Sequence, residues 1–163
     1  MPIRPARSED IDAIRAVTRA AWEAAYAGFM THDAREEALE DGYDPEFLER
    51  VLEERDDLLF VVYERDGEVV GFASAQQTWA DEVELHTLFV HPDHWEAGVG
   101  SELLGTVADS AEASGVDRIR AAVFAENYVG QGFLQAKGFE EIDEDRREMA
   151  GVPYRELVFE RSI

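Results

Sequence analysis

Three features are scarce in this sequence of 163 residues: cysteine, lysine and long apolar runs. The absence of cysteine excludes a disulfide framework, a thiolate zinc site, a cysteine nucleophile and a cysteine-bound iron–sulfur cluster. No stretch reaches the roughly 18 consecutive apolar residues of a membrane-spanning helix, and the opening Met1-Pro2-Ile3-Arg4 has no apolar signal segment. We therefore expect a cytoplasmic protein that binds no membrane.

Lysine occurs only at position 137, so 14 of the 15 basic residues are arginine, and 37 acidic residues bring the net charge to −22. Self-repulsion of this size destabilises a compact fold in dilute buffer, and molar salt screens it by shortening the Debye length to about 3 Å. We expect a protein from a salt-accumulating, halophilic cell, the alternative being an ordinary acidic surface. In either case the negative charge disfavours nucleic acid as a partner.

The length fits one domain spanning residues 1–163, and 45% hydrophobic residues are typical of a folded protein with a core. Apolar periodicity predicts helices at 8–26, from 44, at 99–114 and at 127–137, with a loop or broken helix at 28–43. Strands are expected at 58–63, 69–74, 82–90 and 119–124, before a closing hairpin around residues 151–153. With a short opening strand the order is β-α-α-β-β-β-α-β-α-β-β, a mixed α/β fold.

One segment, from Leu88 to Ser101, joins a strand to a helix through a loop with glycines at 98 and 100. The first amides of a helix lack intrahelical partners and its dipole favours an anion there, while the glycines let a phosphate approach the backbone. A tight turn without a ligand has the same pattern. A dinucleotide fingerprint needs a third glycine where Leu103 stands, and the Gly-Lys-Ser/Thr of a P-loop is absent, so both nucleotide motifs are excluded.

Three motifs in this order resemble the GCN5-related N-acetyltransferases (GNAT), which move an acetyl group from acetyl-CoA to an amine. Leu88-Phe-Val-His-Pro92, Trp95-Glu-Ala-Gly-Val-Gly100 and Leu103-Leu104 are similar to the strand, loop and helix of the family. Ala125-Glu-Asn127, Phe133 and Lys137-Gly-Phe139 are similar to its second motif, and Ile3-Arg-Pro-Ala-Arg with Ala21-Trp22 and Tyr26-Ala-Gly28 to its beginning. The resemblance covers nearly the whole chain and implies a GNAT fold with two parallel strands splayed apart at the cofactor site.

The resemblance also implies how acetyl-CoA, the expected co-substrate, is bound. The backbone of Leu88, Phe89 and Val90 would pair with the pantetheine arm, and Asn127 would contact the cofactor from the second motif. Main-chain amides would hold the pyrophosphate, supplied by the loop residues Glu96, Ala97, Gly98, Val99, Gly100 and Ser101.

Three departures from the family pattern bear on this assignment. Trp95 stands where the family usually has glutamine or arginine, and Glu96 and Ala97 stand where glycine and a basic residue are frequent. An anion near a phosphate lowers affinity at low salt and is screened at high salt. Leu134 occupies the position of the tyrosine that protonates the leaving thiolate in many members.

Attack by an amine requires loss of its proton, so a base or a water path to one is needed. Glu84, on the strand before the glycine loop, is the leading candidate, and His86 lies on the same face if the strand alternates regularly. The alternative for Glu84 is a solvated acid on the strand, and the alternative for His86 is a histidine hydrogen-bonded within the sheet. Tyr128 is the candidate acid for the thiolate, which has the alternative of leaving unassisted because a thiol has a pKa of about 8.5.

The acceptor pocket is expected to involve Tyr26, Phe29 and Trp79, because the first helices and the loop before Glu84 border the acceptor in the resembled family. His91-x-x-His94 lacks a third ligand at a recognisable spacing, so we expect no metal. The expected function is N-acetyl transfer to a small-molecule or peptide amine in a ternary complex. A silent acyl-CoA sensor and an interaction module of the same fold are the alternatives, and the resemblance alone implies a homodimer through the C-terminal strands.

Overall fold

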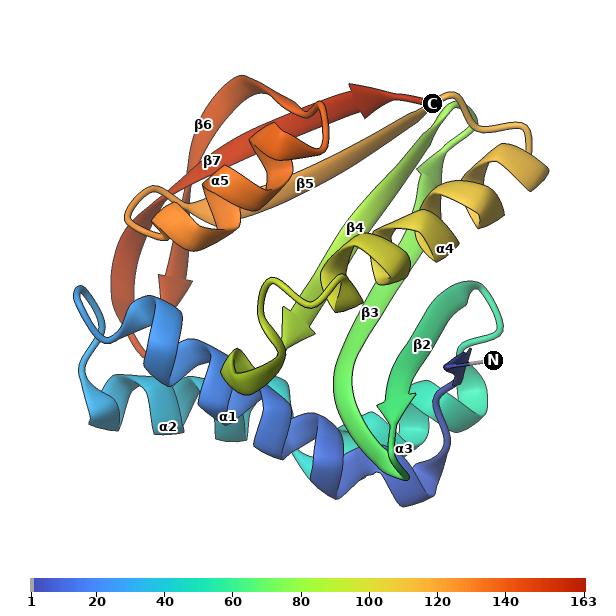
Figure 1. Ribbon diagram of the computed structural model, residues 1–163. Helices are drawn as coiled ribbons and strands as arrows, with labels where there is room; N and C mark the ends of the chain where they lie inside the picture. The colour runs from blue at the N-terminus through green and yellow to red at the C-terminus, as the bar shows by residue number, and fades with distance from the viewer. Residues whose placement is uncertain (1) are drawn as a thin grey trace.

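A seven-stranded mixed sheet forms the centre of the computed structural model, which describes residues 2–163 and leaves Met1 outside (Figure 1). The strand order is β1-β2-β3-β4-β5-β7-β6, and β4 and β5 are the parallel pair. In chain order the elements are β1 (Ile3–Pro5), η1 (Ser8–Asp10), α1 (Ile11–Tyr26), α2 (His32–Gly42), α3 (Pro45–Glu54), β2 (Leu58–Arg65), β3 (Glu68–Trp79), β4 (Glu82–Val90), η2 (Pro92–His94), α4 (Val99–Ala113), β5 (Arg118–Phe124), α5 (Tyr128–Ala136), β6 (Glu140–Met149) and β7 (Val152–Ser162).

The predicted mixed α/β fold is confirmed, but the predicted order is short by one helix. Residues 32–42, inside the expected loop or broken helix, form α2, whose first turn is capped by the Thr31 hydroxyl accepting from the Ala34 amide at 3.1 Å. Only Ala38 and Leu39 of this helix are buried. An apolar stripe this narrow is a weak sequence signal, and packing against α1 stabilises the helix.

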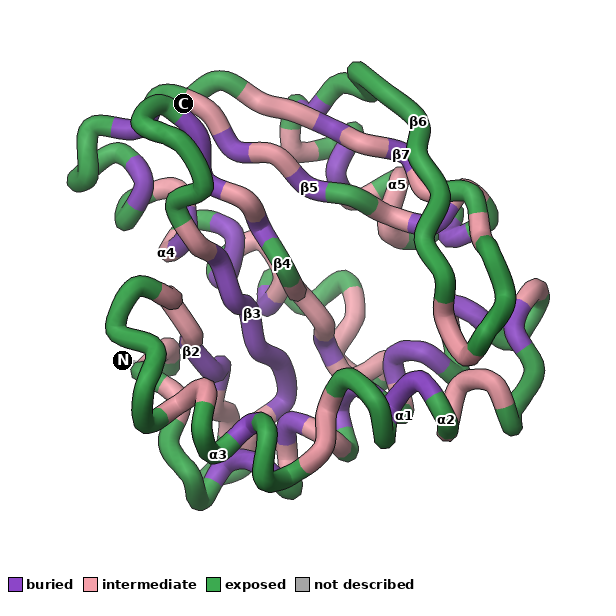
Figure 2. The backbone as a smooth tube through the Cα atoms, turned by 180° about the vertical axis from the view of Figure 1, so that it is seen from behind, coloured by how far each residue is buried: buried purple, intermediate pink, exposed green. Residues whose placement is uncertain are grey.

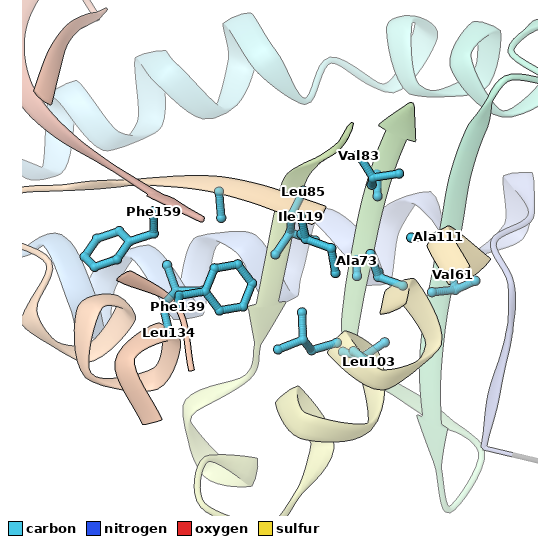
Figure 3. Close-up of a cluster of buried hydrophobic side chains, with 14 of the residues drawn as sticks. Val61, Ala73, Val83, Leu85, Leu103, Ala111, Ile119, Leu134, Phe139 and Phe159 are labelled. Atoms are coloured by element: carbon cyan, nitrogen blue, oxygen red, sulfur yellow. The ribbon is translucent and has the colours of Figure 1, made fainter. Parts of the chain in front are cut away.

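Helices cover both faces of the sheet, which explains why β3 is buried on both sides from Val70 to Ala75 (Figure 2). On one face, α4 and α5 pack on alternate strand residues, and one cluster of buried side chains includes Leu103, Leu134, Ile119 and Phe159 (Figure 3). On the other face, α1 packs on β2, β3 and β4. The glycine at position 71 permits the close approach of α4, because a Cβ there would lie 3.1 Å from a methyl of Val99.

The two parallel strands separate after a short paired stretch. Glu82–Leu85 of β4 pair with Arg118–Ala121 of β5, and beyond this point β4 follows β3 while β5 follows β7 (Figure 1). The register between β3 and β4 shifts so that Leu85 faces Ala75 and Thr87 faces Ser74, leaving His86 as an extra residue in a bulge. The expected splay of parallel strands is therefore present.

Four charged side chains hold the closed end of the splay, and we call them the ion clamp: Glu82, Arg118, Arg120 and Glu160. The Glu82 carboxylate is 4% exposed and lies 3.2 Å from Nε of Arg120 and 3.7 Å from Nε of Arg118. Glu160 of β7 lies 3.5 Å from Arg118 and 3.6 Å from Arg120. The clamp thus joins β4, β5 and β7 where they are still adjacent.

A second ionic contact ties the first strand to the first helices. Asp10 is buried and accepts hydrogen bonds from Nη1 and Nη2 of Arg4 at 2.8 and 2.9 Å, and from the Arg7 amide at 2.8 Å. The hydrogen bonds from Arg4 lower the pKa of the Asp10 carboxyl, although burial opposes them.

The opposite end of the sheet is an exposed edge. Every residue of β6 from Glu140 to Glu148 is exposed, which is visible as a continuous green stretch in Figure 2. Six of these nine side chains are acidic: Glu140, Glu141, Asp143, Glu144, Asp145 and Glu148.

Candidate active site

A cavity of about 970 Å³ opens between the splayed strands. Its walls are the diverging ends of β4 and β5, the start of α4, one side of α5 and part of α1. Beyond Leu85 the edge of β4 that faces β5 has lost its partner strand, so the backbone groups of residues 88–90 on that edge have no strand partner. Apart from the Val90 carbonyl, which accepts a hydrogen bond from the Trp95 indole, they can pair with a bound molecule. Leu88, Phe89 and Val90 all line the cavity.

The loop before α4 has the conformation expected of an anion site. Glu96 and Gly98 adopt positive φ angles of 63° and 86°, and a Cβ at Gly98 would meet no atom within 4 Å. The first intrahelical bond runs from the Glu102 amide to the Gly98 carbonyl at 3.0 Å. The amides of residues 99–101 precede that bond and have no intrahelical acceptor. Gly98, Gly100, Ser101 and Glu96 line the cavity, whereas Val99 is buried in the core and Ala97 is exposed outside the lining.

Trp95 fixes this loop to the end of β4. Its indole Nε1 donates a hydrogen bond of 2.7 Å to the Val90 carbonyl, and its ring packs partly buried against the core. The residue that departs from the family pattern therefore has a structural partner, and it holds the loop at the mouth of the splay.

The start of α5 forms the facing wall. Asn127 is buried, caps this helix by accepting from the Gly130 amide at 2.9 Å, and lines the cavity. Phe133 packs so closely on α4 that a Cβ at Gly100 would lie 3.1 Å from its ring. Lys137, the single lysine, places Nζ 5.9 Å from the centre of the same ring. A cation is thus held beside the glycine loop, on the wall of the cavity.

The three candidate catalytic side chains lie in different surroundings. Glu84 is half-buried on β4 outside the cavity lining. His86, in the bulge, lines the cavity, and its Nε2 lies 3.2 Å from Oε1 of Gln76, the cross-strand neighbour of Glu84. Tyr128 is the first residue of α5, is 74% exposed and lines the cavity.

The three candidate acceptor residues are not brought together. Tyr26 is buried and lines the cavity, and burial raises the pKa of its phenol well above the usual range. Phe29 packs against the rings of Tyr26, Phe124 and Tyr154 behind the cavity wall. Trp79 ends β3, is 69% exposed and lies outside the lining.

Sequence reasoning missed two charged residues of the C-terminal hairpin that line the cavity, Arg147 of β6 and Glu156 of β7. Nη1 of Arg147 lies 3.7 Å from Oε2 of Glu156. Alternation around the buried Leu157 and Phe159 places Glu156 on the other face of its strand. The alternation of buried residues along β7 does not indicate that the face with Glu156 borders a cavity.

Within residues 2–163 no three His, Asp or Glu side chains lie close enough together to hold a metal ion. The rings of His91 and His94 are 6.3 Å apart, and His91 accepts a hydrogen bond from the Asp93 amide. None of the helices in this part of the chain is both long enough and apolar enough to cross a bilayer.

Comparison with known proteins identifies the family. The profile of the acetyltransferase (GNAT) family matches residues 15–139. Spermidine N(1)-acetyltransferase of Thermoplasma acidophilum is 27% identical over 146 residues, which cover 88% of this chain and 90% of that protein.

Solved structures match over almost the full length. The PaiA N-acetyltransferase of Thermoplasma acidophilum in complex with coenzyme A superimposes with a TM-score of 0.87 at 24% identity, covering 99% of this chain and 98% of that one. YncA of Salmonella typhimurium with acetyl-CoA gives a TM-score of 0.73 at 22% identity, covering 99% and 93%. These likenesses agree with the fold, and the profile match over most of the chain shows that it belongs to the GNAT family of acetyltransferases.

Proposed function

We propose that residues 1–163, as one catalytic domain, transfer the acetyl group of acetyl-CoA to a primary amine of a small, positively charged acceptor. The amine attacks directly in a ternary complex. The observation that carries this proposal is one cavity that has free helix amides at one end and the Glu156 carboxylate at the other. Its volume of about 970 Å³ is at the upper end of the roughly 300–1,000 Å³ of small-molecule sites, which suits two substrates side by side.

The residues around the glycine loop fit a pyrophosphate-containing ligand. The amides of residues 98–101 and the dipole of the 15-residue α4 favour an anion, and Gly98 leaves its approach open. Lys137 adds a positive charge opposite the loop and offsets the anionic Glu96. The unpaired edge of β4 at Leu88–Val90 suits the amide-containing arm of coenzyme A.

When bound, acetyl-CoA supplies a thioester carbonyl carbon for the amine to attack. A backbone amide near Leu88 would stabilise the negative charge that develops on the carbonyl oxygen. Glu84 would relay the amine proton to solvent, directly or with His86, and Tyr128 would return a proton to the leaving sulfur. Tyr128 has the exposure for this role, whereas Leu134 is buried and has no proton to give.

A polyamine is the acceptor class that the charge pattern favours. The Glu156 carboxylate lines the cavity, and Glu84, outside the lining, is near enough to act on its pKa. These carboxylates at the site, more than the net charge of −22 that molar salt screens, favour a cationic acceptor. The related spermidine acetyltransferase of Thermoplasma acidophilum supports the same class. We infer that spermidine or a similar polyamine is acetylated in preference to neutral amines and peptide amino termini.

Calorimetry followed by turnover tests this function. Acetyl-CoA is titrated into the protein at about 2 M KCl, where surface repulsion is screened, and one-to-one binding is expected. Release of free CoA is then measured with spermidine, putrescine, benzylamine and an alanyl peptide. Binding without turnover on any amine would indicate a silent acyl-CoA sensor, and no binding by the folded protein would indicate an interaction module.

A further inference from the structure

Glu156 is placed at the open end of the splay, on the wall that sequence reasoning missed. It lies on β7 opposite Phe124, the last residue of β5, and opposite Asp145 of β6. Phe124 packs into the cluster beneath α1, so Glu156 shares that side of the sheet. Its side chain is only 14% exposed and lines the cavity together with Leu88 and Phe89.

The partners of Glu156 leave its carboxylate available. Arg147 is its one ion-pair partner within residues 2–163, and the 3.7 Å separation is too long for a hydrogen bond. Arg147 is itself 59% exposed. Glu160, four residues along the same strand, faces two cations instead, Arg118 and Arg120 of the ion clamp, at 3.5 and 3.6 Å. Of these two glutamates on one strand, the one in the cavity has a single cationic partner, and that partner is exposed.

The charges around Glu156 favour proton uptake. Burial is the largest cause that raises the pKa of its carboxyl, and the negative charges of Asp145 and Glu84 act in the same direction. Arg147 on β6 opposes them. From α1 the facing titratable group is Tyr26, whose buried phenol stays neutral at the pH of the reaction.

We propose that Glu156 is a catalytic residue that binds the protonated acceptor amine and accepts its proton, an inference that rests on the proposed function. The ammonium gives one proton to the carboxylate, which leaves a neutral amine and a carboxylic acid. The amine lone pair forms the bond to the acetyl carbon, the C–S bond breaks, and its electron pair leaves with sulfur. Tyr128 gives its proton to the thiolate and is reprotonated by the second N–H proton, and Glu156 releases its own proton to solvent through the relay at Glu84. The products are the amide, free CoA and one proton.

The test compares Glu156→Gln with Asp145→Asn in the full chain at about 2 M KCl. Both variants remove one carboxylate from the same pair of facing residues, but Asp145 is exposed and outside the cavity lining. We expect kcat/KM for spermidine to fall about 100-fold or more in Glu156→Gln, the lower bound for losing a general base, and to stay within about threefold in Asp145→Asn. Glu156→Asp should recover part of the loss.

Two further measurements separate this role from a structural one. Acetyl-CoA affinity by calorimetry should be unchanged in Glu156→Gln, and the rise of kcat/KM with pH that reports the free carboxylate should disappear. Glu156 is overturned as the base if Glu156→Gln retains wild-type kcat/KM, or if it loses acetyl-CoA binding together with activity. Failure of the wild type to acetylate any amine would instead overturn the proposed function, and this inference with it.

Discussion

The ion clamp offers a direct test of how the splay is held, through the substitution Glu82→Gln. Removing one member of a buried ion pair costs about 3–5 kcal/mol, because the partner charge stays behind. Here Glu160 still faces both arginines, and their side chains are 38% and 39% exposed. We therefore expect a cost below that range, roughly 2 kcal/mol. For a chain of this length that lowers Tm by about 4–8 °C.

Thermal unfolding followed by circular dichroism at about 0.2 M and 2 M KCl measures the difference. Because the Glu82 carboxylate is almost inaccessible to solvent, we expect the loss to persist at high salt, where exposed pairs are screened. Glu68→Gln is the matched control, since Glu68 is an exposed strand residue without an ion pair to any of residues 2–163. A Tm of Glu82→Gln that equals that of the control at both salt concentrations would refute the reasoning.

Three further predictions follow from contacts described above. Asp10→Asn should lower the free energy of unfolding by about 2 kcal/mol at pH 7. The pKa of Asp10 is lowered in the folded state, so the stabilisation from its carboxylate is present above the ordinary pKa and is lost as the pH falls through the lowered value. Urea unfolding should therefore show the stabilities of the variant and the wild type converging in acid. Trp95→Phe removes the hydrogen bond to Val90, worth about 1 kcal/mol, and should weaken acetyl-CoA binding about fivefold by calorimetry, whereas an unchanged Kd would show that the loop needs no anchor. In a KCl series Tm should keep rising beyond about 0.2 M, and a maximum below that concentration would contradict adaptation to molar salt.

Much of the fold was predictable because its signals are local. Asp44 as a helix cap and Pro45 as the first helical residue predict the start of α3, and the glycines at 98 and 100 predict the start of α4. The helix α2 was missed because it has only two buried residues, and the contacts that stabilise it come from α1.

The residues of the candidate site also differ in whether local sequence signals could predict their position. Residues 88–101 form one continuous segment, so their joint position at the cavity follows from a single strand, loop and helix. Glu156 and Arg147 reach the cavity only through the pairing of β5 with β7 and of β7 with β6, which depends on residues far apart in the sequence. His86 departs from simple alternation because the bulge is set jointly with β3.

The exposed acidic strand β6 has a consequence for edge-to-edge contacts between copies of this protein. An edge strand offers unpaired backbone groups to any other strand, and such contacts start edge-to-edge aggregation. A second β6 approaching it would bring rows of carboxylates to within the roughly 5 Å spacing of neighbouring strands. This repulsion disfavours the addition of an eighth strand by pairing of two β6 edges, most strongly in dilute buffer, where the charges are least screened.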